Sequence, residues 1–242
     1  MANFNTHIAV AAVASGLLAT AALKLEQVFE TEAVLLTFLG TLGGILPDID
    51  LKYSHPSRII FTFLGIIAAC ATVFALQAQF SIVELWLSAG LVFLLLRYPV
   101  WGVFHHFTSH RGAIHSLAAA AMFGLGTSAI AYHGFQQSAL MAWLYGGFVT
   151  YGFVVHLALD ELYSVDFVGN TVKSSFGSAL KLPDRSEWIS SSVIVTLTVA
   201  FWLSAPPTEA LSTLTSSETL QSLYQQLLPA DGWFGTRLSD HQ

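Results

Sequence analysis

The chain has 242 residues, of which 54% are hydrophobic and only 10% are charged, and its formal net charge is −6. This balance lies far outside that of soluble domains and indicates an integral membrane protein. The acidic charge, without any basic run, argues against a nucleic-acid partner. The single cysteine, Cys70, excludes a disulfide framework and a thiolate-rich metal site.

Seven apolar segments are predicted to form membrane helices. They cover residues 8–23, 33–47, 59–79, 82–103, 113–133, 138–163 and 188–205. The first two are shorter than the roughly 20 residues that a helix needs to cross a bilayer, so we expect them to tilt, to thin the bilayer or to form a re-entrant hairpin. The sequence therefore predicts an all-α, polytopic membrane helix bundle over residues 1–205, followed by a polar tail over 206–242 that is able to form an amphipathic helix.

Two stretches predict close helix packing. Gly40, Gly43 and Gly44 precede Pro47 in the second segment, which favours a broken or tightly packed helix that is buried in protein. The fifth segment has small residues on every face, so neighbouring helices can approach it closely.

The orientation in the membrane follows from the basic residues. The N-terminal residues end in small side chains like a signal peptide, but they lack its basic n-region, so we expect a retained helix. When the loops are assigned alternately to the two sides, seven of the nine Lys and Arg residues fall on the side of the N-terminus. The positive-inside rule identifies that side as the cytoplasm.

Ionisable residues recur at the segment ends that map to this cytoplasmic side. They are His7, Asp48 and Asp50, several residues of the stretch 105–116, and the pair His156 and Asp160.

His156 and Asp160 lie four residues apart in an apolar helical run, so both side chains share one face and can reach one ion or two adjacent ions. Such a pair in a membrane segment indicates a functional site. The alternative is that the two side chains bond each other or reach toward water.

Asp48 and Asp50 follow Pro47, where a turn can present both carboxylates, or one as a metal ligand and the other as its hydrogen-bonding partner. The alternative for Asp50 is a solvated loop residue or the N-cap of the next helix.

The stretch 105–116 contains four histidines and an arginine. We expect His110 in the loop and His115 in the first turn of the fifth segment, where the two can converge on one ion. The guanidinium of Arg111 matches an anionic oxygen of a phosphate or carboxylate. His105 and His106 are assigned to the membrane interface. Nitrogen and carboxylate ligands together favour zinc, manganese or iron over magnesium or calcium.

Four motifs carry a resemblance to a known family. They are Thr6–His7, Gly43–Asp50, His110–Ser116 and His156–Asp160. In order and spacing they resemble the motifs of the YdjM-like family of bacterial inner-membrane metal-dependent hydrolases, over about residues 1–170. Ile114 stands where the family pattern has a threonine. The wider spacing after Asp50 leaves His55 outside the ligand set.

This family is distantly similar to the zinc-dependent phospholipase C and single-strand nuclease group, which are all-helical metalloenzymes. The resemblance implies a multi-pass protein of the bacterial inner (plasma) membrane with a site on the cytoplasmic face. It also implies a divalent metal ion, with zinc preferred and manganese or iron as alternatives. The ligands that it implies are His7, Asp48, His110, His115, His156 and Asp160.

The predicted function is a membrane-embedded hydrolase of an amphiphilic, phosphate-ester or lipid-like substrate at the cytoplasmic membrane boundary. In it, Asp50 or a histidine moves protons and Arg111 binds the head group. The alternative is a non-catalytic membrane protein, either a metal or proton transporter or a scaffold. A transporter needs polar groups through both halves of the bilayer, and here the far half of the segments is nearly bare apart from Glu84.

Overall fold

The computed structural model describes residues 3–50, 55–107, 112–166, 171–172 and 188–227. The described α-helices are, in chain order, α1 (Phe4–Lys24), α2 (Glu30–Gly43), α3 (His55–Leu76), α4 (Ile82–Leu95), α5 (Trp101–Phe107), α6 (Leu117–Ala129), α7 (Ala139–Leu162), α8 (Trp188–Leu203) and α9 (Ser217–Gln226). The predicted all-helical class is confirmed.

Shorter elements connect these helices. They are the 3-10 helices η1 (Leu46–Asp50) and η5 (Thr208–Thr213), and the π-helices η2 (Leu96–Val100) and η3 (Ile130–Gly134). Two-residue strands β1 (Val165–Asp166) and β2 (Thr171–Val172) pair antiparallel after α7.

Within the described residues, four helical segments are long and apolar enough to cross a membrane: Phe4–Lys24, Pro56–Leu76, Ile82–His106 and Ala139–Leu162. The predicted number of seven is not confirmed, because α2 and α6 have only 14 and 13 residues and α8 has 16. The first segment, in contrast, is longer than predicted. The side chain of Asn3 caps the helix by accepting a hydrogen bond from the Thr6 amide, so α1 includes the polar residues before the apolar run and reaches 21 residues.

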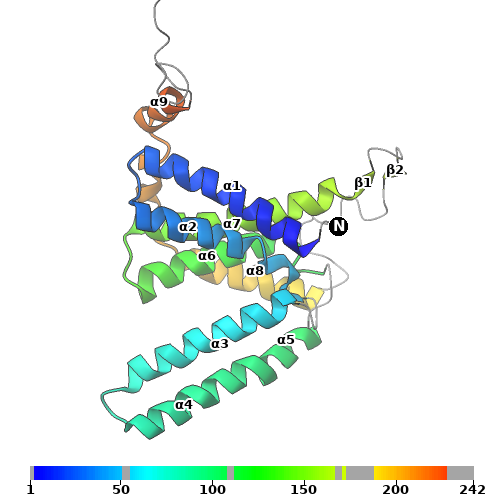
Figure 1. The fold of residues 1–242 in the computed structure, drawn as a ribbon, viewed down its shortest axis with the longest axis vertical. Helices are drawn as coiled ribbons and strands as arrows, with labels where there is room; N and C mark the ends of the chain where they lie inside the picture. The colour runs from blue at the N-terminus through cyan, green and yellow to red at the C-terminus, as the bar shows by residue number, and fades with distance from the viewer. Residues whose placement is uncertain (1–2, 51–54, 108–111, 167–170, 173–187, 228–242) are drawn as a thin grey trace, which may run out of the picture.

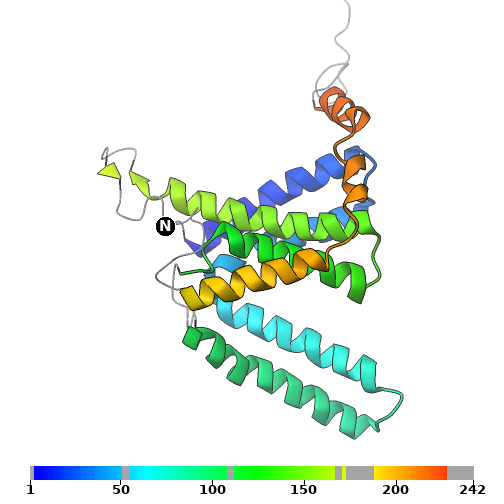
Figure 2. The ribbon, with the colours of Figure 1, turned by 180° about the vertical axis from the view of Figure 1, so that it is seen from behind.

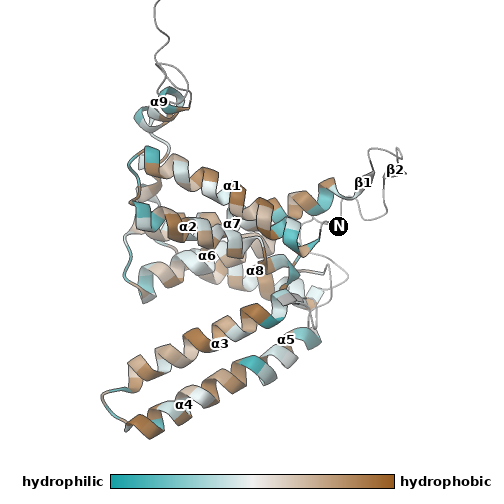
Figure 3. Ribbon diagram, viewed as in Figure 1, coloured by the Kyte–Doolittle hydropathy of each residue, from teal (hydrophilic) through white to brown (hydrophobic). Residues whose placement is uncertain are grey.

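The helices form two groups (Figures 1 and 2). One is a bundle in which α7 contacts α1, α2 and α6, while α8 packs on α6. The other is a hairpin of α3 with the continuous helix formed by α4, η2 and α5, and α3 also contacts η1. Hydrophobic residues dominate both arms of this hairpin (Figure 3), and large side chains such as Phe63, Ile67, Trp86 and Leu87 are exposed. A surface of this kind suits lipid as the surrounding solvent.

Glycines bring α2 and α7 into backbone contact. A Cβ atom on Gly152 would overlap with the carbonyl oxygen of Gly40, and one on Gly43 would overlap with the carbonyl oxygen of Val149. The predicted tight packing of the second segment is therefore confirmed. Its consequence is that the C-terminal end of α2 lies directly against the second half of α7.

The chain after α8 also forms helices. Leu214 packs against a buried cluster from α1, α2 and α7, and α9 leaves Leu220, Tyr224 and Leu227 exposed. These three residues follow helical spacing. The sequence predicts an amphipathic helix through Leu211, Leu214, Leu220, Leu223 and Leu227, and the first two of these lie before α9. The division into a bundle and a tail stays a prediction.

Candidate metal centre

Five of the predicted ligands meet at one end of the bundle. His7 comes from the first turn of α1, Asp48 from η1, His115 from the turn before α6, and His156 and Asp160 from the last turns of α7. All five are buried, and the most exposed of them, Asp48, is only 8% accessible. Four separate elements thus deliver ionisable side chains to one apolar location.

Local sequence explains how two of these residues are placed. Pro47 follows the end of α2, and the chain continues as the 3-10 turn that carries Asp48. Ser116 is the N-cap of α6: its hydroxyl accepts a hydrogen bond from the Ala119 amide and donates one to the Ala113 carbonyl. His115 therefore lies in the capped turn before α6, and its predicted position in the first turn of that helix is wrong.

Four possible metal-ligand atoms form a closed ring in which imidazole nitrogens and carboxylate oxygens alternate. The Nε2 atom of His156 lies 3.7 Å from Oδ1 of Asp48 and 3.8 Å from Oδ2 of Asp160. The Nε2 atom of His115 lies 3.9 Å and 4.0 Å from the same two oxygens. The predicted shared face of His156 and Asp160 on α7 is confirmed by this contact.

The ring has nearly the size of a metal site. A tetrahedral ion with ligand distances of about 2.0–2.2 Å separates its ligand atoms by roughly 3.3–3.6 Å. The four observed separations exceed this range by a few tenths of an ångström. The four nitrogen–oxygen separations are therefore close to those around one ion.

A backbone carbonyl sets the direction in which His156 faces. Its Nδ1 atom lies 2.7 Å from the carbonyl oxygen of Gly44. Because a carbonyl oxygen only accepts, Nδ1 carries the hydrogen, and Nε2 presents its lone pair to the ring of donors. Histidine ligands of metal ions are commonly held in this way.

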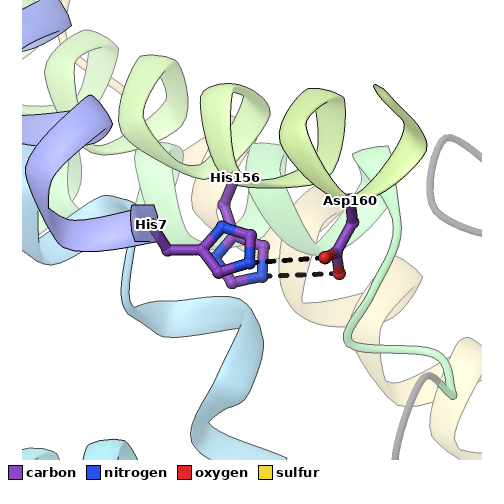
Figure 4. A group of neighbouring side chains, drawn as sticks. All are labelled: His7, His156 and Asp160. Atoms are coloured by element: carbon purple, nitrogen blue, oxygen red, sulfur yellow. Dashed lines mark ion pairs between the residues drawn. The ribbon is translucent and has the colours of Figure 1, made fainter. Parts of the chain in front are cut away.

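His7 contacts the same cluster from the side of α1 (Figure 4). Its ring stacks on that of His156, with centroids 3.7 Å apart and 14° between the planes. Its Nε2 atom lies 3.3 Å from Oδ1 of Asp160. Asp160 thus faces three imidazoles: Oδ1 faces His7, and Oδ2 faces His115 and His156.

Buried atoms of the cluster need a further partner. Within the described parts of the chain, Nε2 of His156 and both carboxylate oxygens of Asp160 make no hydrogen bond of suitable geometry. Burying such groups costs free energy unless they are paired or bind a metal ion. Two groups of three satisfy the spacing for an ion: His7 with His156 and Asp160, and Asp48 with His115 and His156. The nitrogen and oxygen donors fit the predicted divalent metal, and its identity stays a prediction.

The remaining predicted site residues are not brought into this geometry. His110 and Arg111 lie outside the described residues, and so does the side chain of Asp50. Their predicted roles as ligand, anion-binding group and proton carrier stay predictions. The alternative of Asp50 as the N-cap of the next helix also stays a prediction, because residues 51–54 lie outside the described residues.

The interface prediction for His105 is also wrong, whereas His106 is exposed. His105 is buried, with Nε2 3.1 Å from the hydroxyl of Ser57 and Nδ1 2.8 Å from the carbonyl oxygen of Trp101. The indole N–H of Trp101 donates to the same hydroxyl at 2.9 Å. These bonds tie α3 to α5. The spacing of Trp101 and His105 on one helical face hinted at their contact, but Ser57, 48 residues from His105, gave no signal in the sequence.

Comparison with known proteins identifies the family. The profile of the family described as YdjM inner membrane protein matches residues 1–223. The chain belongs to this family. The resemblance of the four motifs is thereby confirmed, and the match extends beyond residue 170. The description supports an inner-membrane protein and names no activity. Neither a curated protein nor a solved structure matches the chain.

Proposed function

We propose that this YdjM-family protein is a membrane-embedded, metal-dependent hydrolase of amphiphilic phosphate-ester or lipid-like substrates. The observation that carries the proposal is the buried ring formed by His115, His156, Asp48 and Asp160. Ionisable groups inside membrane helices are costly and are retained mainly for function.

Zinc fits this donor set best. Two imidazole nitrogens and two carboxylate oxygens suit a tetrahedral zinc ion, with manganese or iron as alternatives. When bound, the ion supplies Lewis acidity that polarises a phosphoryl or carbonyl oxygen and acidifies the attacking water. If all four residues bind, they fill a tetrahedral shell, so hydrolysis would require a fifth coordination position for the attacking water. Asp48 has the most accessible side chain of the ring, at 12%, so we expect water and substrate to enter beside it.

The residues of the chain divide the remaining work. His115 and His156 hold the centre, and the Gly44 carbonyl keeps His156 in its ligand tautomer. Asp50, two residues after Asp48, is assigned to accept the proton of the attacking water and return it to the leaving oxygen. Arg111 is assigned to bind an anionic head group through its planar fork.

The apolar surroundings favour an amphiphilic substrate. Next to the centre lies a buried apolar cluster to which η1, α3, α7 and α8 contribute Ile49, Phe61, Leu157 and Ile194. A substrate with a hydrocarbon chain could keep that chain in the bilayer while its head group reaches the ring. The positive-inside pattern of the sequence supports a cytoplasmic location for this end of a multi-pass bundle.

A transporter is the competing function, and one detail argues against it. The carboxylate of Glu84, in the far half of the predicted segments, accepts hydrogen bonds from the amide and the hydroxyl of Ser81 at 2.8 Å and 2.6 Å. Glu84 therefore closes the capping box of α4 and is exposed. It does not continue an ionisable path from the metal centre.

The test is to purify the protein in detergent and to measure bound metal and hydrolysis of phospholipid and isoprenoid phosphate substrates. The variants His115→Ala and Asp160→Ala are expected to lose both the metal and the activity. His106→Ala, on an exposed residue, is the control and should keep both. Normal metal content in the His115→Ala and Asp160→Ala variants would contradict the proposal. Metal uptake into proteoliposomes would favour a transporter.

A further inference from the structure

The stacking of His7 on His156 limits what both residues can bind. The two rings are almost parallel, at 14°, with centroids 3.7 Å apart. Their Nε2 atoms point to different oxygens of Asp160, His7 toward Oδ1 and His156 toward Oδ2 (Figure 4). The two nitrogens therefore face the same carboxylate side by side.

A single ion cannot accept both nitrogens in this arrangement. An imidazole binds a metal through a lone pair that lies in the plane of its ring, with the ion about 2.0–2.1 Å away. An ion at that distance from both Nε2 atoms would lie between the two stacked rings, far out of both planes. His7 and His156 are therefore not ligands of the same ion.

Charge argues against a second ion at His7. Among the five residues of the centre only Asp48 and Asp160 are carboxylates, and their two negative charges balance one divalent cation. A second dication in the same apolar location would have a charge without a counter-charge among these residues, which is costly in a membrane bundle. The described residues next to His7 offer only Asp160 as a further ligand.

We propose that His7 is a positioning residue that holds Asp160 from outside the coordination sphere, and that one ion is bound by His115, His156, Asp48 and Asp160. This inference rests on the proposed metal centre. An unprotonated Nε2 on His7 would set its lone pair against Oδ1 of Asp160, so this nitrogen carries a hydrogen that faces the carboxylate. His7 thereby lies against Oδ1 at 3.3 Å, in an ion-pair contact without hydrogen-bond geometry, and leaves Oδ2 for the ion. Replacing such outer partners lowers metal affinity by about 10–100-fold.

The test uses the full-length protein in detergent, loaded with zinc or cobalt. Native protein should bind one ion per chain, and X-ray absorption should count two imidazole ligands. His7→Gln, whose amide can also donate to Asp160, should keep both counts and the visible spectrum of tetrahedral cobalt. His7→Ala should keep the imidazole count with about 10–100-fold weaker binding. His156→Gln should lose an imidazole or the ion.

The loss of an imidazole ligand in His7→Gln would overturn the assignment of His7 while leaving the metal centre intact. Three imidazoles in the native protein that persist in His7→Gln would instead overturn the set of four ligands and point to His110. Two ions per chain would overturn it as well. A native protein without any bound ion would contradict the proposed function itself. One ion with two imidazoles but no hydrolysis would support the role of His7 and remove only the activity.

Discussion

The Nδ1–H group of His156 donates a hydrogen bond of 2.7 Å to the carbonyl oxygen of Gly44, across the contact between α7 and α2. This bond joins the glycine-mediated contact between α2 and α7 to the candidate metal centre. Gly152 lies one helical turn before His156, and there the backbones of the two helices touch. The geometry of the centre therefore depends on residues that bind nothing themselves.

Gly152→Ala should weaken both the fold and the metal site. The new Cβ would overlap with the backbone of Gly40, so α2 must move away and take the Gly44 carbonyl from His156. Overpacking of this kind costs about 1–3 kcal/mol. Thermal unfolding and metal affinity, both measured in detergent, report the two effects.

Gly147→Ala is the matched control, because a Cβ at this position on the same helix meets nothing within 4 Å. It should behave like the native protein in both measurements. Equal behaviour of the two glycine variants would show that the helix contact does not support the centre.

Removing the metal should destabilise the protein. Without a cation, the buried carboxylate of Asp160 has two oxygens that make no hydrogen bond within the described residues. A ligand that binds only the folded state adds about 2.7 kcal/mol to the free energy of unfolding when its concentration is 100 times its Kd. We expect a chelator to lower the melting temperature and zinc to restore it.

Asp160→Asn serves as the comparison for the chelator experiment. It removes one ligand charge at almost constant shape, so its melting temperature should no longer respond to chelator or zinc. A native protein that melts at the same temperature with and without chelator would contradict the prediction.

Ser57→Ala should lower stability without changing the metal content. The substitution removes the acceptor for the Trp101 indole and the partner of His105, all in a buried region between α3 and α5. Each buried polar group that loses its hydrogen-bond partner lowers the stability of the folded state by about 1–3 kcal/mol. Ser192→Ala, which removes an exposed hydroxyl bonded only within α8, is the control. Loss of the metal in Ser57→Ala would mean that this network is part of the site.

The proposed topology can be tested by labelling in intact cells. On a Cys70→Ser background, His106→Cys lies at the site end of the bundle and Gln136→Cys at the opposite end, between α6 and α7, and both positions are exposed. A membrane-impermeant maleimide should label position 136 and should reach position 106 only after lysis. The reverse pattern would put the metal centre on the outer face.

Helical spacing and topology in the sequence predict much of this site. His156 and Asp160 were placed together by their spacing, which depends only on the local helix. His7, Asp48 and His115 were assigned to one side of the membrane, but their contacts depend on helix packing that no local pattern encodes. The role of Gly44 depends on its backbone carbonyl. Because every residue has such a carbonyl, the residue type does not indicate this role.

The failures have the same origin. His105 looked like an interface residue because its neighbours in sequence lie at a helix end, and its burial depends on Ser57 from another helix. The first segment looked too short because polar residues at the start of α1 were counted as loop, although the Asn3 cap includes them in the helix. Long-range partners and capping decided both cases.

The most direct measurement is an experimental structure of the zinc-loaded protein. We predict one ion within about 2.0–2.2 Å of Nε2 of His115 and His156 and of a carboxylate oxygen of Asp48 and Asp160. His7 should remain stacked on His156 without touching the ion. Zinc bound elsewhere, or a ring of donors that stays without an ion at saturating zinc, would contradict the metal centre.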